Sequence, residues 1–208
     1  MSTTTVDHPL VRCHLTRLRD AATEPAEFRI LVQRLATLLA YEATQDLRTA
    51  PCTVTTPLTD AAGERLDERI GLVPILRAGL GLVDPVLHLI PSAEVWHLGL
   101  YRDETTAQPV RYYEKLPESR PVDVALILDP MLATGGSAVA AIERLHRWKV
   151  PRIKLLSVLA AREGIDRVLS EFPQTQIYVC DVDPELNAQK FIVPGLGDAG
   201  DRIFNTLG

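Results

Sequence analysis

Short apolar runs alternate with helical repeats along most of the chain. The apolar runs fall at Ile70–Leu76, Val95–Tyr101, Val122–Leu128, Ile153–Ala160 and Gln176–Val182. Runs of this length with few polar residues are typical of strands that are covered on both faces of a parallel sheet. The pattern therefore predicts an α/β fold in which right-handed βαβ units connect the strands of a parallel sheet.

Helical periodicity fills the segments before and between these runs. Apolar residues recur along one face of Glu24–Leu47, and shorter repeats of the same kind follow at Val83–Leu87, Ala138–Trp148 and Glu163–Phe172. This spacing predicts amphipathic helices that pack on the sheet. The N-terminal segment Met1–Asp20 mixes basic and apolar residues, so we expect an arm or a short helix there.

Two further segments do not fit the parallel sheet. Pro51–Asp67 is polar and β-branched with a glycine in its second half, which predicts a hairpin or a crossover outside the main sheet. Arg102–Pro117 is long and polar, as expected for a loop that closes over an active site as a lid. Arg111 and Lys115 are basic candidates in this loop, although a solvated charged loop explains them as well.

The residues after the third apolar run suggest a binding site. Pro130 cannot donate a ladder hydrogen bond, so the strand should end before it, on Asp129. The loop Ala133–Ser137 has two glycines and two hydroxyl groups and leads into a helix, whose free N–H groups suit a phosphate. A carboxylate at a strand's carboxyl end lies where open α/β sheets bind ligands, and it can accept hydrogen bonds from sugar hydroxyls. Together these features predict a site for a phosphorylated ribose.

Two other interpretations of the loop are compatible with its glycines and hydroxyls. It could be a strand-to-helix turn in which Thr134 caps the helix and the glycines are incidental. It could also be a loop that binds a nucleoside triphosphate. That motif requires a lysine before its serine or threonine, whereas Gly136 precedes Ser137 here. The second interpretation is therefore disfavoured.

Composition limits the class of protein. A chain of 208 residues with 46% hydrophobic residues fits one domain spanning residues 1–208. The net charge of -5 argues against general binding to nucleic acid or a membrane surface. We expect neither a membrane-spanning segment nor a signal peptide, because the apolar runs are too short and the N-terminal residues lack a basic region followed by an apolar stretch. Cys13, Cys52 and Cys180 are odd in number and far apart, so we expect no disulfide framework or zinc site and a cytoplasmic location.

Several motifs resemble one family. Asp129–Ser137, with the sequence DPMLATGGS, resembles the signature with which uracil phosphoribosyltransferases bind PRPP, 5-phospho-α-D-ribosyl 1-diphosphate. Many phosphoribosyltransferases begin this loop with two acidic residues, whereas the uracil-specific group has Asp-Pro, as here. The other similar segments, in chain order, are HPLV and LRD before residue 21, YEAT (41–44), PILRAGLG (74–81), YRDE (101–104) and FIVPGLGDAGDR (191–202). The resemblance therefore runs nearly from end to end.

This resemblance implies a fold and an activity. The fold would be a type I phosphoribosyltransferase-like (Rossmann-like) core with a small hood or arm formed by the N-terminal and C-terminal segments. The enzyme would be a pentosyltransferase of pyrimidine salvage that transfers the 5-phosphoribosyl group of PRPP to uracil, giving UMP and diphosphate. Mg²⁺ would be held mainly through PRPP, without a direct protein ligand. The family also suggests a homodimer or higher homo-oligomer, and GTP activates some of its members.

The resemblance also assigns roles to residues. PRPP binding falls on Arg77, Arg102, Asp129, Pro130, Met131, Leu132, Ala133, Thr134, Gly135, Gly136, Ser137 and Asp198. Uracil binding falls on Ile192, Gly197, Asp198 and Ala199, where backbone groups would read the edge of the base. Catalysis would use Arg77 and Arg102 on the leaving pyrophosphate. Asp198 would orient Mg²⁺-bound water or aid loss of the uracil proton.

The C-terminal segment has two unusual features. Gly195–Gly200 matches the letters of the dinucleotide-binding pattern, but that pattern opens a helix within a βαβ unit of ~30 residues. Only eight residues follow Gly200, so we expect instead a glycine-shaped loop that presents backbone groups to a planar ligand. Lys190 and Phe191 stand where the family usually has Gly-Tyr, which argues against a contact through a tyrosine hydroxyl.

Three other functions remain compatible with the sequence. The chain could be a phosphoribosyltransferase for another base, such as a purine, which assays with a panel of bases would reveal. It could be an RNA-binding pyrimidine regulator, although such proteins carry a paired-acid version of the loop. It could also be a nucleotide-binding module that binds UMP without turnover.

Overall fold

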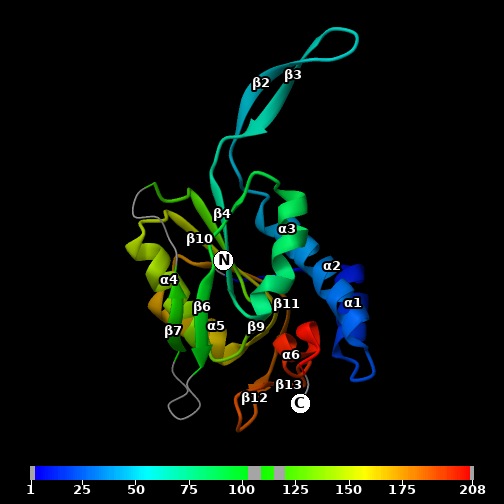
Figure 1. Cartoon of the computed structure of the whole chain (residues 1–208), viewed down its shortest axis with the longest axis vertical. Helices are drawn as coiled ribbons and strands as arrows, with labels where there is room; N and C mark the ends of the chain where they lie inside the picture. Colours follow the sequence, from blue (N-terminus) through cyan, green and yellow to red (C-terminus); the bar gives the residue numbers. More distant parts are fainter. Residues whose placement is uncertain (1–2, 103–108, 115–119, 207–208) are drawn as a thin grey trace.

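A mostly parallel sheet forms the centre of the molecule (Figure 1). The computed structural model of the chain describes residues 3–102, 109–114 and 120–206. In spatial order the sheet consists of β1 (Thr3–Thr5), β11 (Gln176–Asp183), β10 (Arg152–Ala161), β8 (Val124–Leu128), β4 (Ile70–Leu76), β6 (Leu98–Arg102) and β7 (Pro109–Glu114). The short strands β5 (Glu94–Val95) and β9 (Met131–Leu132) pair with β4 and β10. All five apolar runs thus form strands of one sheet, as the sequence predicts.

Helices cover both faces of the sheet because side chains of each strand alternate between two cores. Leu72 and Leu126 contribute to one core, whereas their neighbours Val73 and Ile127 contribute to the other. The first core is closed by α1 (Pro9–Arg19), α2 (Pro25–Ala43), α3 (Val83–Leu89) and α6 (Ala199–Phe204). The second is closed by α4 (Gly136–Arg147) and α5 (Arg162–Glu171). A 3-10 helix, η1 (Ala78–Leu82), connects β4 to α3.

The N-terminal segment does more than the sequence indicates. The expected short helix is α1, but the residues before it form strand β1, which pairs in parallel with β11 at the edge of the sheet. Three consecutive threonines carry no apolar signal, but their β-branched side chains suit an edge strand.

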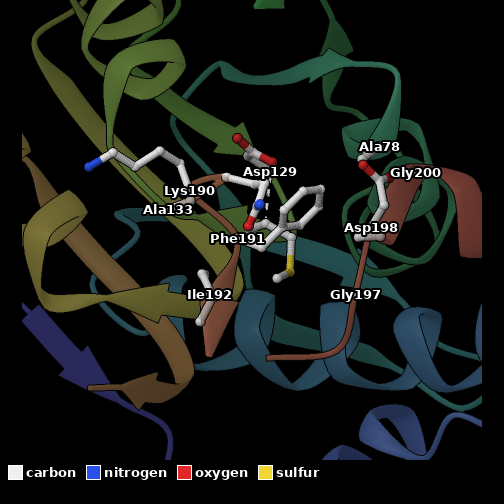
Figure 2. Close-up of a pocket in the computed structure, with 12 residues that line it drawn as sticks. Ala78, Asp129, Ala133, Lys190, Phe191, Ile192, Gly197, Asp198 and Gly200 are labelled. Carbon is white, nitrogen blue, oxygen red and sulfur yellow. Dashed lines mark hydrogen bonds between the residues drawn. The ribbon is translucent and has the colours of Figure 1, made fainter. Parts of the chain in front are cut away.

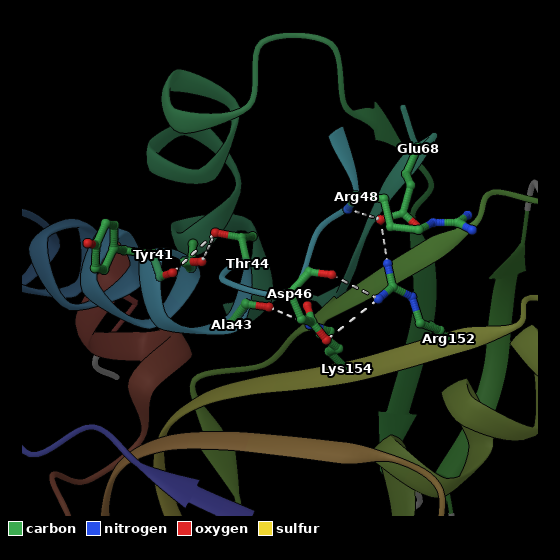
Figure 3. A network of polar contacts seen from close by, with 9 residues as sticks. Tyr41, Ala43, Thr44, Asp46, Arg48, Glu68, Arg152 and Lys154 are labelled. Atoms are coloured by element: carbon green, nitrogen blue, oxygen red, sulfur yellow. Dashed lines mark hydrogen bonds and ion pairs between the residues drawn. The ribbon is translucent and has the colours of Figure 1, made fainter. Parts of the chain in front are cut away.

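A hairpin outside the main sheet is confirmed. It consists of β2 (Thr49–Thr55) and β3 (Asp60–Leu66), which pair in antiparallel fashion and project from the body of the molecule (Figure 1). Figure 3 shows the polar contacts at its base, where Arg48 and Arg152 both bind the Glu68 carboxylate. The base of the hairpin is therefore tied to strand β10.

The predicted loop Arg102–Pro117 is wrong over residues 109–114. These residues form β7, which pairs in antiparallel fashion with β6. The segment VRYY is rich in β-branched and aromatic residues, which favour a strand over a loop. Residues 103–108 and 115–117 of the expected lid, Lys115 among them, lie outside the described residues, and so does the side chain of Arg111.

The C-terminal segment forms a small unit beyond the carboxyl ends of the central strands, with β12 (Glu185–Leu186) pairing with β13 (Ile192–Val193) before α6. The expectation of a loop throughout this segment is wrong from Ala199 onward, where α6 begins with Asp198 as its N-cap. Arg202 of α6 donates to the carbonyl of Leu18 at the end of α1. The N-terminal and C-terminal segments therefore contact each other, as a hood formed by both requires.

No helix in the part of the chain that the structure describes is long and apolar enough to cross a membrane.

Candidate active site

The loop between β8 and α4 has the geometry of an anion-binding site. Strand β8 ends before Pro130, as the sequence predicts, but its last residue is Leu128 and not the expected Asp129. Gly135 has a φ of 77°, a left-handed conformation that glycine adopts without strain, and it stands at the N-cap of α4. No described side chain caps this helix, so its first N–H groups point from the loop without an intrahelical acceptor. Those groups suit a phosphate, rather than the turn capped by Thr134 that was the alternative.

The loop Ala133–Ser137, named the phosphate loop after its predicted ligand, packs against the start of α5. A Cβ added to Gly164 would lie 2.4 Å from the carbonyl oxygen of Ala133, and one added to Gly135 would lie 2.9 Å from the carbonyl oxygen of Gly164. Two backbone segments meet here at a distance that only glycine allows. The start of α5 therefore fixes the position of the phosphate loop. The sequence around Gly164 gave no signal of this role.

Asp129 stands at the carboxyl end of β8 and is partly buried. Its Oδ1 accepts a hydrogen bond of 3.3 Å from the backbone N–H of Met131. Burial raises the pKa of the Asp129 carboxyl to about 7, and the hydrogen bond from Met131 lowers it in part. A carboxylate with few partners in the free protein has lone pairs available for the hydroxyl groups of a ligand.

A cavity of about 280 Å³ connects this loop to the C-terminal segment (Figure 2). Its lining comes from three distant parts of the chain and consists of Ala78, Asp129, Met131, Ala133, Gln189, Lys190, Phe191, Ile192, Gly197, Asp198, Ala199 and Gly200. In Figure 2 the ring of Phe191 lies between the carboxylates of Asp129 and Asp198. The cavity thus has two acidic side chains with an apolar ring between them. It is also lined by backbone groups of the C-terminal segment 183–206, named the tail below.

The tail is bent by backbone conformations that only a few residues adopt easily. The Val193–Pro194 peptide bond is cis, and Gly195 and Gly197 have φ values of 61° and 80°. A Cβ on Gly195 would lie 2.1 Å from the carbonyl oxygen of Ile192. Asp198 follows this bend and accepts a hydrogen bond of 2.9 Å from the backbone N–H of Asp201, which caps α6. The bend presents the backbone of Gly197 and Ala199 to the cavity.

Arg77 lies at the same edge of the sheet, after the carboxyl end of β4, which neighbours β8. It follows β4 through a cis Leu76–Arg77 peptide bond, and its exposed guanidinium donates to Asp201 at 3.2 Å. A Cβ on the nearby Gly79 would lie 2.2 Å from the carbonyl oxygen of Leu128, so the segment after Arg77 packs directly against the end of β8. The cavity lining includes Ala78 but not Arg77. The backbone of Arg102 ends β6, and its side chain lies outside the described part of the structure.

The structure brings together seven of the site residues assigned from the sequence. Those that line the cavity are Asp129, Met131, Ala133, Ile192, Gly197, Asp198 and Ala199. Thr134, Gly135, Gly136 and Ser137 continue from Ala133 into the first turn of α4. Pro130 and Leu132 are buried, and the Leu132 side chain packs into the core, so only their backbone groups are available to a ligand.

Some lining residues were not assigned from the sequence. Ala78 and Gly200 lie within motifs that carry the family resemblance, whereas Gln189 carried no signal. Lys190 and Phe191, which differ from the usual Gly-Tyr of the family, both line the cavity. The Lys190 ammonium lies 3.6 Å from the Glu163 carboxylate at the start of α5, so this lysine spans from the tail to the side of the phosphate loop.

Comparison with known proteins identifies relatives over nearly the whole chain. The model of the uracil phosphoribosyltransferase family matches residues 5–206. Uracil phosphoribosyltransferase from a Roseiflexus species is 57% identical over 199 residues, which cover 96% of each protein. The enzyme of the same name from Halalkalibacterium halodurans is 50% identical over 201 residues, again covering 96% of each.

Two solved structures are similar in fold. A protein from Aquifex aeolicus superimposes with a TM-score of 0.92 at 35% identity and covers 97% of both chains. A variant hypoxanthine phosphoribosyltransferase from Trypanosoma cruzi, complexed with the product IMP, gives a TM-score of 0.50 at 13% identity and covers 76% of this chain and 75% of its own. The latter similarity concerns the fold alone. The family match, the curated relatives and the geometry of the phosphate loop lead to one conclusion: this chain belongs to the uracil phosphoribosyltransferase family.

Proposed function

We propose that this chain is a uracil phosphoribosyltransferase, which transfers the 5-phosphoribosyl group of PRPP to uracil and releases diphosphate. The observation that carries the proposal is the cavity in which Asp129, the phosphate loop and the glycine-bent tail meet. Relatives that carry the name of this activity match the chain over 96% of their own length. The whole chain, residues 1–208, would act as one phosphoribosyltransferase domain.

PRPP occupies the edge formed by β8 and α4. The N–H groups of Thr134–Ser137 hold the 5-phosphate, since the start of α4 leaves them without intrahelical acceptors. Asp129 accepts hydrogen bonds from the ribose hydroxyls, and the backbones of Pro130, Met131 and Leu132 shape the floor. A deprotonated Asp129 is the better acceptor, so PRPP binding draws its pKa down from about 7.

Uracil binds against the tail. Backbone N–H and C=O groups at Ile192, Gly197 and Ala199 pair with the carbonyl and N–H groups along the edge of the base. The ring of Phe191 supplies an apolar face inside the same cavity. A base with a different donor and acceptor pattern would leave a buried polar group unpaired, which disfavours it.

The leaving pyrophosphate lies toward Arg77 and Arg102. The Arg77 ion pair with Asp201 is exposed, with 59% of the arginine side chain accessible, so little free energy opposes its transfer to a phosphate. Two guanidinium groups would neutralise the charge that develops on the leaving group as the bond to the anomeric carbon breaks. Arg102 would act from the end of β6.

Asp198 lies beside both substrates. Its carboxylate either orients water on a bound Mg²⁺ or helps remove the uracil proton. The donor set of the cavity fits Mg²⁺, because carboxylate oxygens of Asp129 and Asp198 are hard ligands that hold such an ion through water. When bound to PRPP, the ion neutralises charge on the pyrophosphate.

The remaining features concern assembly and regulation. We propose a homodimer or higher homo-oligomer, because the projecting hairpin presents Val54 and Leu58, which are 50% and 96% exposed. We also propose GTP as an effector on the family resemblance alone. A cytoplasmic site of pyrimidine salvage fits the three cysteines, all of which are free thiols.

The test is UMP formation from uracil and PRPP, with and without Mg²⁺, and again with GTP added. We expect UMP that depends on the metal. Absence of UMP while PRPP still binds would contradict the proposal and direct the search to hypoxanthine, guanine and other bases under the same conditions. Unchanged rates with GTP would remove the effector from the proposal.

A further inference from the structure

The N-terminal helix reaches the uracil-binding tail through a partly buried arginine. Arg19 is the last residue of α1, and its side chain is 21% exposed. Its two terminal nitrogens donate to both oxygens of Asp183, at 2.7 and 2.6 Å. This is a two-point pair between a guanidinium and a carboxylate whose side chain is only 5% exposed.

The same two residues also hold the bend of the tail. Arg19 donates to the carbonyl oxygen of Gly195 at 2.9 Å, and the N–H of Gly195 donates to Asp183 at 2.9 Å. Both polar groups of the Gly195 backbone are therefore fixed by one ion pair. Asp183 ends β11, and Gly195 lies twelve residues later. The ion pair of Arg19 and Asp183 therefore joins the two ends of the segment that contains β12 and β13.

Gly195 lies in the middle of the proposed base site. Ile192 precedes it and Gly197, Asp198 and Ala199 follow it, and all four line the cavity. The left-handed φ of 61° at Gly195 turns the chain so that both parts face the same cavity. A rotation of its peptide groups would move the backbone atoms that are proposed to read uracil.

A second arginine strengthens the connection from the opposite direction. Arg202 of α6 donates to the carbonyls of Leu18 and Leu196, both at 2.8 Å, and its guanidinium lies 4.3 Å from the ring centre of Phe28. The end of α1 and the bent tail are thus joined on both sides of Gly195. The tie at Arg19 differs from this one because it runs through ion pairs with carboxylates, whereas Arg202 donates to backbone carbonyls.

We propose that Arg19 and Asp183 are positioning residues for base recognition, which fix the Gly195 bend and thereby set the affinity for uracil. The inference rests on the proposed function, and it assigns a role to the LRD segment that the reaction itself leaves unexplained. The phosphate loop lies between β8 and α4, and among the described residues the hydrogen bonds and ion pairs of Arg19 and Asp183 do not involve it. The effect should therefore fall on uracil far more than on PRPP.

Steady-state kinetics of Arg19→Gln, Arg19→Lys and Asp183→Asn test this role. We expect the KM for uracil to rise at least about tenfold, the KM for PRPP to stay within about threefold, and Arg19→Lys to recover only part of the loss, because a lysine cannot make the two-point contact. Asp181→Asn is the matched control. Asp181 is on the same strand and accepts one bond from Arg19, at 3.0 Å, but its side chain is 50% exposed and does not touch Gly195.

Equal increases in both KM values, or none, would overturn the proposal. If Arg19→Gln does not fold, the milder Asp183→Asn variant decides the question by the same comparison. Amide hydrogen exchange provides a readout without substrate. Exchange at residues 195–199 should quicken about tenfold in the variants while residues 136–142 keep their rates, and unchanged exchange at 195–199 would also reject the role. A wild-type protein that makes no UMP would refute the proposed function, while the exchange experiment would still judge the positioning role.

Discussion

Among the described residues, Asp129 combines a partly buried position with one hydrogen bond from the backbone. Its carboxyl has a pKa raised to about 7 by burial, so near neutral pH a change of a few tenths of a unit alters its charge. For a carboxyl group whose pKa is raised on folding, the folded state is favoured by protonation and loses stability as the pH rises from about 4 to about 7. The ionised Asp129 carboxylate therefore lowers the free energy of unfolding, while it is the form that accepts hydrogen bonds from the proposed ligand.

Replacing Asp129 with Asn separates these two effects. We expect Asp129→Asn to be more stable to unfolding than the wild type at pH 8, yet to bind PRPP roughly 10- to 150-fold more weakly, since a hydrogen bond to a charged group contributes about 1.5–3 kcal/mol. Calorimetric titration from pH 6 to 8 should also show a PRPP affinity that rises with pH more steeply in the wild type. Identical pH profiles for the two proteins would disprove a role for this ionisation.

Asp198 has both a structural and a proposed chemical role. Asn and Asp cap helices about equally well, so Asp198→Asn should keep the bond to the Asp201 N–H and leave the melting temperature nearly unchanged. We expect its turnover to fall by about two orders of magnitude or more, as for loss of an acid–base group. Near-normal turnover in stopped assays of UMP formation would remove Asp198 from the mechanism.

At the scale of elements, the phosphate loop depends on the helix behind it. Gly164 of α5 lies so close to Ala133 that any side chain must displace one of two backbones. Strain of this kind costs about 1–3 kcal/mol. The position of the loop is therefore set by packing between α5 and the strand-to-helix turn.

Gly164→Ala tests this dependence. We expect the KM for PRPP to rise roughly 5- to 150-fold, if the displaced loop loses that free energy in binding. Gly63→Ala in the hairpin is the matched control, since its Cβ would meet only Cys52 Sγ at an ordinary 3.7 Å. Equal KM values for the two variants would show that the close approach has no role in binding.

At the scale of the whole molecule, the polar network of Figure 3 lies at the end of the sheet from which the hairpin projects. The Glu68 side chain is only 1% exposed and accepts hydrogen bonds from the backbone and side chain of Arg48, at 2.9 Å each, and one from Arg152. Next to it, Lys154 is fully buried and binds Asp46 and the carbonyl of Ala43. The legs of the hairpin are thus held to β10.

Glu68→Gln should weaken the fold without changing the chemistry. Burial alone would raise the pKa of Glu68, but the hydrogen bonds and the nearby positive charges hold it below its usual value. Its stabilising effect is therefore present above the normal pKa of a glutamate and is lost as the pH falls through the lowered value. We expect a loss of about 1.5–3 kcal/mol at pH 7, or roughly 3–12 °C in Tm, with kcat unchanged.

The comparison for this variant is Glu171→Gln, which removes an exposed pair with Arg167 inside α5 and should change Tm by less than about 1 °C. Thermal unfolding at pH 7 and again near pH 3 measures both effects. A difference between Glu68→Gln and the wild type that persists undiminished at the lower pH would contradict the ionic origin of the stability.

Local signals determined much of this protein. Apolar runs with few polar residues predicted the five strands, because strands buried on both faces have few polar positions. The turn from Asp129 to Ser137 was identifiable because glycines, hydroxyls and a carboxylate occur together within one short segment. Strand β1, strand β7 and helix α6 were missed, since polar, aromatic or glycine-rich segments adopt the structure that their neighbours impose.

The contacts behind and between the motifs depend on the packing of distant parts of the chain. Gly164 supports the phosphate loop, and Arg19 meets Asp183 across 164 residues of chain, and neither contact has a local sequence pattern. Local sequence patterns were sufficient to predict the fold class and the segments proposed to carry the chemistry. Their relative placement came from the sheet, because packing of strands and helices is what brings residues distant in the chain to one edge.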